Sequence, residues 1–216
     1  MFNTSMTWDD FLLMLQGAGI TLAITFWAVL GGTILGIMFG LIRASGPMWA
    51  RTTIGGFLDI FRSIPLLIQL VLFNSFNSIA KLGLPPFKVA CMALAIYTAA
   101  YCTEVVRSGI LAVPVTTRRA ARSLGMTWLQ DLRYIVLPMA TRVMLPSWIG
   151  LTLGVMKDTA LVLWIGIAEL LRNSQTIITR LQEPLFILMI AGLIYFAMSF
   201  PIARIGAHLE RKWQNQ

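Results

Sequence analysis

The sequence predicts an all-α integral membrane protein with five transmembrane helices in a single domain over residues 1–216. Hydrophobic residues make up 57% of the chain and charged residues 12%, which is about half the charged fraction of an average soluble domain. Several apolar segments exceed the roughly 18 residues that indicate a membrane-spanning helix. Alternating strands of about 10 residues, which a membrane β-barrel would need, do not occur.

The first three spans are expected at about residues 17–42, 54–79 and 87–110. In the first span, glycine recurs at every fourth position from Gly32 to Gly40, which predicts close packing against another helix. In the second, Pro65 predicts a kink because proline removes a helical hydrogen bond. In the third, Glu104 and Arg107 lie three residues apart and are expected to form an ion pair on one helix face.

The last two spans are expected at about residues 133–156 and 184–205, and Pro138 and Pro146 are expected to bend the first of these two. Between the two spans, residues 159–171 form an apolar run of only about 13 residues. This run is too short to cross a bilayer, so we expect it to be re-entrant or to lie at the interface.

Positive charge predicts the orientation of the chain, because cytoplasmic loops carry an excess of lysine and arginine. The cations that follow spans one, three and five are Arg43, Arg51, Arg107, Arg118, Arg119, Arg122, Arg133, Arg204, Arg211 and Lys212. We therefore expect the N-terminus outside the cell and the C-terminus in the cytoplasm. The formal net charge of +8 belongs to these loops and does not indicate nucleic-acid binding.

The most basic loop, at about residues 112–132, is predicted to contain a short helix over residues 118–124. We expect Thr116 or Thr117 to cap this helix and Gly125 to end it. Small residues, a leucine and an arginine stand together at Arg119, Ala120, Ala121 and Leu124. Two interpretations fit such a helix: it lies on an anionic membrane surface, or it docks onto another protein.

Short motifs follow one another in a fixed order along nearly the whole chain. They are Thr21-Leu22, Phe61-Arg62-Ser63-Ile64-Pro65-Leu66-Leu67-Ile68-Gln69, Ala100-Tyr101 with Glu104 and Arg107, Ala120-Ala121 with Gly125, Ile135, Leu137-Pro138 and Arg142, Leu145-Pro146, and Lys157-Asp158-Thr159. This ordered set resembles the permease subunits of bacterial ABC importers for polar amino acids. Most of these relatives have a glutamate where this chain has Arg119.

The resemblance implies a type I importer permease fold in the bacterial inner membrane. The 112–132 loop would be the coupling helix, with Arg119, Ala120, Ala121, Leu124 and Gly125 contacting a pair of ATPase subunits. ATP and Mg²⁺ would be bound by that pair, since this chain lacks the G-x-x-x-x-G-K-[ST] motif and is not expected to be an enzyme. A second permease subunit, identical or paralogous, and an extracytoplasmic solute-binding protein would complete the complex.

The resemblance also implies a substrate pathway, for which the candidates are Asp158, Tyr97, Gln69 and Thr98. An ionisable residue within a membrane segment is costly, so Asp158 is expected to receive a substrate ammonium group, to pair with Lys157 or to be solvated at the interface. Tyr97 is expected to contact a small ligand or to pack in the core, and Gln69 to line the pathway or to join helices.

Two other classes of function remain open at the level of the sequence. An ion-coupled secondary transporter would need acids within the membrane, for which Asp158 is the candidate. A membrane-embedded enzyme would need a nucleophile with a base, or a set of metal ligands. The only histidine, His208, stands in the charged tail, so we expect no metal site and no bound cofactor.

Overall fold

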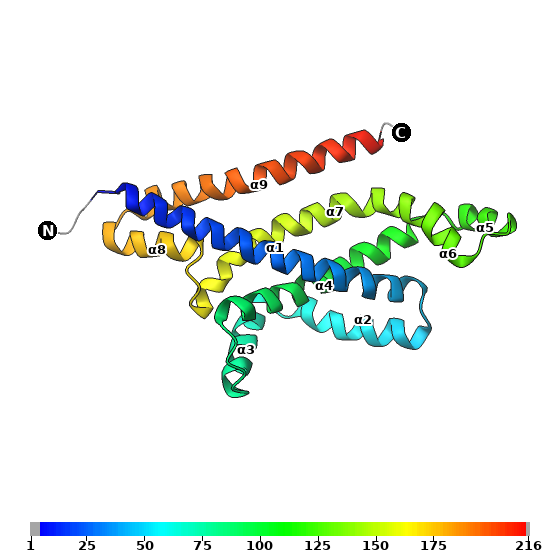
Figure 1. Cartoon of the computed structure of the whole chain (residues 1–216), viewed down its shortest axis with the longest axis horizontal. Helices are drawn as coiled ribbons and strands as arrows, with labels where there is room; N and C mark the ends of the chain where they lie inside the picture. Colours follow the sequence, from blue (N-terminus) through cyan, green and yellow to red (C-terminus); the bar gives the residue numbers. More distant parts are fainter. Residues whose placement is uncertain (1–4, 215–216) are drawn as a thin grey trace.

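The computed structural model describes residues 5–214, and these residues form a bundle of long helices with short connecting helices (Figure 1). The elements are α1 (Trp8–Ser45), α2 (Met48–Ser63), α3 (Leu66–Ile79), α4 (Pro86–Leu111), α5 (Val115–Ser123), α6 (Trp128–Asp131), a π-helical turn (Leu132–Val136), α7 (Leu137–Asp158), a 3₁₀ helix (Thr159–Ile165), α8 (Leu170–Leu181) and α9 (Pro184–Gln214). Within the described residues, four helical segments are long and apolar enough to cross a membrane, and the bent pair of α2 and α3 makes a fifth if it counts as one span.

The first span is longer than predicted, because α1 begins at Trp8 rather than near residue 17. Thr7 caps the helix by accepting from the backbone N–H of Asp10, while the Asp10 carboxylate accepts from the backbone N–H of Thr7. Asp10 also pairs with Arg180 of α8. This capping box extends the helix beyond its apolar segment.

The predicted packing role of the glycine stripe is confirmed, and α4 is the helix that packs against it. Thr98, Cys102 and Val106 of α4 face Gly32, Gly36 and Gly40 in turn. A Cβ atom at Gly36 would lie 2.5 Å from the Cβ of Cys102, and one at Gly40 would lie 2.6 Å from the Cβ of Val106. Only glycine allows α1 and α4 to approach this closely.

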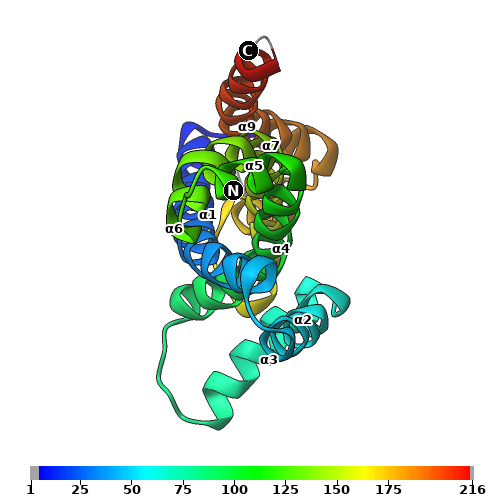
Figure 2. The ribbon, with the colours of Figure 1, turned by 90° about the vertical axis from the view of Figure 1, so that its right-hand side faces the viewer.

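The prediction of a single kinked helix over residues 54–79 is wrong. Two helices, α2 and α3, meet there at a bend of 102°. Ile64 is extended, as a residue before proline prefers, and Pro65 is the N-cap residue of α3. The Gln69 side chain holds the break by donating from Nε2 to the backbone oxygens of Phe61 (2.7 Å) and Ile64 (2.8 Å). The outer part of α3 therefore projects sideways from the bundle (Figure 2).

The fourth predicted span starts earlier than residue 133, at Trp128, because Thr127 and Gln130 form a second capping box. Pro138 falls in the first turn of α7, directly after the π-helical turn, and Pro146 lies inside α7. The apolar run after α7 begins inside the candidate span Trp128–Ile165. It forms the 3₁₀ helix and then leads into α8, an amphipathic helix that the sequence analysis did not predict.

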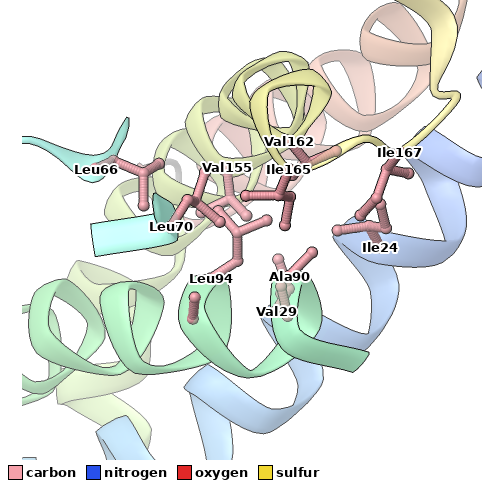
Figure 3. Close-up of a cluster of buried hydrophobic side chains, with 12 residues drawn as sticks. Ile24, Val29, Leu66, Leu70, Ala90, Leu94, Val155, Val162, Ile165 and Ile167 are labelled. Carbon is pink, nitrogen blue, oxygen red and sulfur yellow. The ribbon is translucent and has the colours of Figure 1, made fainter. Parts of the chain in front are cut away.

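The largest apolar cluster lies where α3 enters the bundle. Leu66 and Leu70 of α3 point into a space between α1, α4, α7 and the 3₁₀ helix (Figure 3). Val155 and Val162, on either side of the α7 terminus, belong to the same cluster, and Tyr97 packs against it. The end of α7 is thus held rigidly from several sides, which positions the residue at that end, Asp158.

Candidate functional site

Asp158 is the last residue of α7, and its carboxylate is half-buried. Within residues 5–214 this carboxylate has no hydrogen bond and no ion pair, and the side chain of the neighbouring Lys157 is exposed. The expected alternative, an ion pair with Lys157, is therefore not formed. The Asp158 oxygens are not among the fully buried atoms without a partner, so the carboxylate is accessible and is suited to receive a cation.

Tyr97 of α4 packs against the apolar cluster that contains Val155, three residues before Asp158 in α7. Its ring is half-buried and packs against the ring of Tyr101 in a tilted arrangement, with ring centroids 4.8 Å apart and an angle of 54° between the planes. The structure thus brings together two of the four residues predicted for the pathway. A carboxylate beside a pair of tyrosine rings can bind an ammonium group by charge and by cation–π attraction.

The other two predicted pathway residues are buried where helices pack together. Thr98 is 0% exposed, donates to the backbone oxygen of Leu94 at 2.7 Å and packs against Gly32. Gln69 is 2% exposed and uses its amide nitrogen at the break between α2 and α3, while its Oε1 atom is buried without a partner. For Gln69, the role of joining helices fits the structure better than that of lining a pathway.

A buried carboxylate that the sequence analysis missed is Glu169, at the start of α8. It is 0% exposed and accepts from the backbone N–H groups of Leu171 (2.8 Å) and Arg172 (2.7 Å) and from the hydroxyl of Tyr195 (3.2 Å). Burial raises the pKa of Glu169 above its usual value, and these donors act in the opposite direction. The contacts join α8 to α9.

The predicted ion pair of Glu104 with Arg107 is confirmed at 2.8 Å, and Asp59 forms a similar pair with Arg62 in α2. Glu104 has two further partners that spacing along one helix cannot reveal. Arg43 of α1 lies 2.8 Å away and Arg62 of α2 lies 3.8 Å away. One carboxylate therefore ties together the neighbouring ends of α1, α2 and α4.

The basic loop forms a hairpin of α5, a turn and α6, which we call the α5–α6 hairpin (residues 115–131). The predicted cap is wrong: α5 begins at Val115 after Pro114, so Thr116 and Thr117 lie inside the helix. The predicted end is confirmed, because Gly125 has φ +83°. The N–H of Gly125 donates to Arg122 O and that of Met126 to Ala121 O, which is a Schellman motif.

The predicted face of Ala120, Ala121 and Leu124 is only partly formed. Ala121 is 5% exposed and packs inside its own chain, so it cannot contact another protein in this structure. Ala120 is exposed, and Leu124, which follows the end of α5, is 84% exposed. Arg119 is exposed on the same helix. Of the predicted contact residues, Arg119, Ala120 and Leu124 are thus accessible, while Ala121 and Gly125 shape the hairpin.

The hairpin lies at the same end of the molecule as the connection between α1 and α2, and α8 lies at the opposite end (Figure 1). The basic loops after spans one and three are therefore on one side, as the charge pattern predicts. Among the described residues, no group of three or more histidine, cysteine, aspartate or glutamate side chains is arranged to hold a metal ion.

Comparisons with known proteins agree with this arrangement. The model of the family described as "Binding-protein-dependent transport system inner membrane component" matches residues 32–215. The glutamine transport system permease protein GlnP of Escherichia coli is 31% identical over 214 residues, which covers 98% of this chain and 97% of that protein. The octopine transport system permease protein OccM of Rhizobium meliloti is 31% identical over 218 residues, covering 97% and 89%. The glutamate/aspartate import permease protein GltK of Escherichia coli is 31% identical over 209 residues, covering 92% of each.

Solved structures agree with the fold. The crystal structure of an amino acid ABC transporter with histidines superposes with a TM-score of 0.86 and 30% identity, over 96% of this chain and 99% of that one. These likenesses confirm the predicted ABC importer permease fold and the predicted resemblance to permeases of polar amino-acid importers. The chain therefore belongs to the family of inner membrane components of binding-protein-dependent transport systems, the permease subunits of ABC importers.

Proposed function

We propose that this permease carries polar amino acids or close analogues, and that Asp158 receives the ammonium group of the substrate beside Tyr97. The observation that carries the proposal is the half-buried Asp158 carboxylate, which has no partner in the described residues and ends the helix against whose last turns Tyr97 packs. Similar permeases are named for glutamine, octopine and glutamate/aspartate transport. All of these compounds contain an α-amino group, so one carboxylate serves the whole class.

The proposed complex contains a pair of ATPase subunits, a second permease and an extracytoplasmic solute-binding protein. ATP and Mg²⁺ belong to the ATPase pair, and the exposed part of the α5–α6 hairpin is the proposed contact with that pair. Closure of the ATPases would move the hairpins and switch the permease between inward- and outward-facing states. Because the chain belongs to a binding-protein-dependent transport family, we do not propose an ion-coupled secondary transporter.

The hairpin assignment is tested with Leu124→Glu, which places a charge where an 84% exposed leucine would meet the partner. We expect the variant to insert into the membrane normally. The rate of substrate-stimulated ATP hydrolysis should fall at least about tenfold, because charged residues are disfavoured in interface cores. The measurement is ATP hydrolysis in proteoliposomes with binding protein and substrate. Leu124→Met is the matched control, and unchanged stimulation in Leu124→Glu would remove the hairpin from the proposal.

We further propose that the N-terminus faces the outside and that the hairpin is cytoplasmic. Thr116 of α5 and Thr176 of α8 are both exposed and lie at opposite ends of the molecule. In a background without Cys91 and Cys102, an impermeant thiol reagent should label Thr176→Cys in intact cells and Thr116→Cys only after permeabilisation. Labelling of Thr116→Cys in intact cells would reverse the orientation.

A further inference from the structure

The α5–α6 hairpin carries an exposed cationic edge. A shallow pocket of about 220 Å³ is lined by Val115, Arg118, Arg119, Arg122 and Asp131. Arg119 and Arg122 are exposed, and neither has an ion-pair partner among the residues that the structure describes. The pocket therefore presents two charges that are not neutralised within this chain.

The third arginine of this pocket, Arg118, forms an ion pair within the hairpin. Arg118 lies 3.2 Å from Asp131, which is 1% exposed. This pair fixes α5 against α6 and neutralises Arg118. The other oxygen of Asp131, Oδ1, is a buried acceptor without a partner, and Arg119 and Arg122 remain exposed and do not pair with it. These two arginines are therefore available to a partner that approaches α5.

A membrane surface is a poor occupant for this edge. A helix that lies in the bilayer interface buries an apolar face of large residues. In α5 the only large apolar residue is Val115, and Ala121 is packed inside the chain. In the hairpin, the exposed large apolar residues are Val115 in α5 and Leu124, Trp128 and Leu129 beyond its end. Arginine and tryptophan are both enriched in protein interfaces.

We infer that the partner ATPase meets Arg119 and Arg122 with carboxylate side chains, so that an acidic groove selects this permease. The inference rests on the proposed docking of the hairpin and adds the chemistry of the partner surface. Opposite charges across an interface accelerate encounter and reject partners of the wrong sign. The cationic edge would thus exclude an ATPase whose groove is itself basic.

The first test locates the carboxylates directly. Arginine does not couple to carboxylates through a carbodiimide, whereas a lysine amine does, so Arg119→Lys and Arg122→Lys keep the charge and add the reactive group. The complex with its ATPase is purified from native membranes, treated with a carbodiimide and analysed by mass spectrometry. We expect a zero-length crosslink from the new amine to an aspartate or glutamate of the ATPase. Crosslinks only to Asp131 of the same chain, or none in a complex that still hydrolyses ATP, would overturn the inference.

The second test measures association. Purified ATPase is added back to the permease in nanodiscs, and the association rate is followed as NaCl is raised. Arg119→Glu with Arg122→Glu should slow association at least about tenfold at low salt and flatten its salt dependence. Arg204→Glu with Arg211→Glu makes the same charge change in α9, away from the pocket, and should leave the rate unchanged.

Two outcomes separate the possible failures. If the double variant associates normally while Leu124→Glu loses coupling, the hairpin docks but its groove is not acidic, and only this inference fails. If the slowing disappears in nanodiscs that contain only zwitterionic lipids, the arginines act on anionic lipid, and the inference is again overturned. Slowing in both lipid compositions supports the acidic groove.

Discussion

Replacing Gly36 by leucine should separate α1 from α4 and lower the free energy of unfolding by about 3 kcal/mol, at the upper end of what overpacking costs. Even a single added Cβ would lie 2.5 Å from the Cβ of Cys102 and 3.2 Å from its backbone carbon. The backbone cannot give way locally, because Gly32 and Gly40 hold the same two helices in register. We expect a lower melting temperature in detergent and less protein in the membrane.

Gly19→Leu is the matched control, because a Cβ atom at Gly19 of the same helix would have no neighbour within 4 Å. It should melt like the parent protein. A compensating pair sharpens the test: Gly36→Ala should destabilise by a smaller amount, and adding Cys102→Gly should recover part of the loss by removing the opposing Cβ. Equal melting temperatures for Gly36→Leu and Gly19→Leu would mean that α1 and α4 do not pack as the structure shows.

The spans and the glycine stripe could be predicted because they depend on local composition and on a fixed helical period. The break at Pro65 could not be predicted as a 102° bend, because a proline alone accounts only for a kink. The bend needs the Gln69 amide, which replaces lost backbone hydrogen bonds at Phe61 and Ile64. That contact exists only once α3 has turned away from α2.

In the candidate site as well, single residues could be predicted from the sequence, whereas their contacts could not. Asp158 and Tyr97 could be identified singly as polar groups in apolar spans, and their proximity emerges only when α4 packs beside α7. Ala121 looked like a contact residue because the sequence does not show that the hairpin would bury it. Glu169 could not be found from the long apolar segments, because it lies outside them, directly before the amphipathic helix α8. A carboxylate at an N-cap is nevertheless a recognisable signal in a sequence.

Asp158→Asn should raise the transport KM by roughly thirtyfold, which corresponds to about 2 kcal/mol for a charge-assisted hydrogen bond to an ammonium group. The substitution keeps the size of the side chain and removes its charge. Because Asp158 has no partner in the described part of the chain, its neutralisation breaks no internal ion pair, and assembly with the ATPase should be unaffected.

The measurement is uptake by proteoliposomes over a full range of substrate concentrations, with basal ATP hydrolysis recorded in parallel. Asp158→Glu keeps the charge and should retain part of the uptake, and Lys157→Gln changes the exposed neighbour and should behave like the parent. Tyr97→Phe removes only the hydroxyl and keeps the aromatic ring. A normal KM in this variant would mean that Tyr97 acts through cation–π contact of its ring and not through its hydroxyl. If Asp158→Asn transports at the parent rate at every concentration, the carboxylate is structural. The ammonium site would then belong to the second permease, because the other two predicted residues, Gln69 and Thr98, are buried in helix packing.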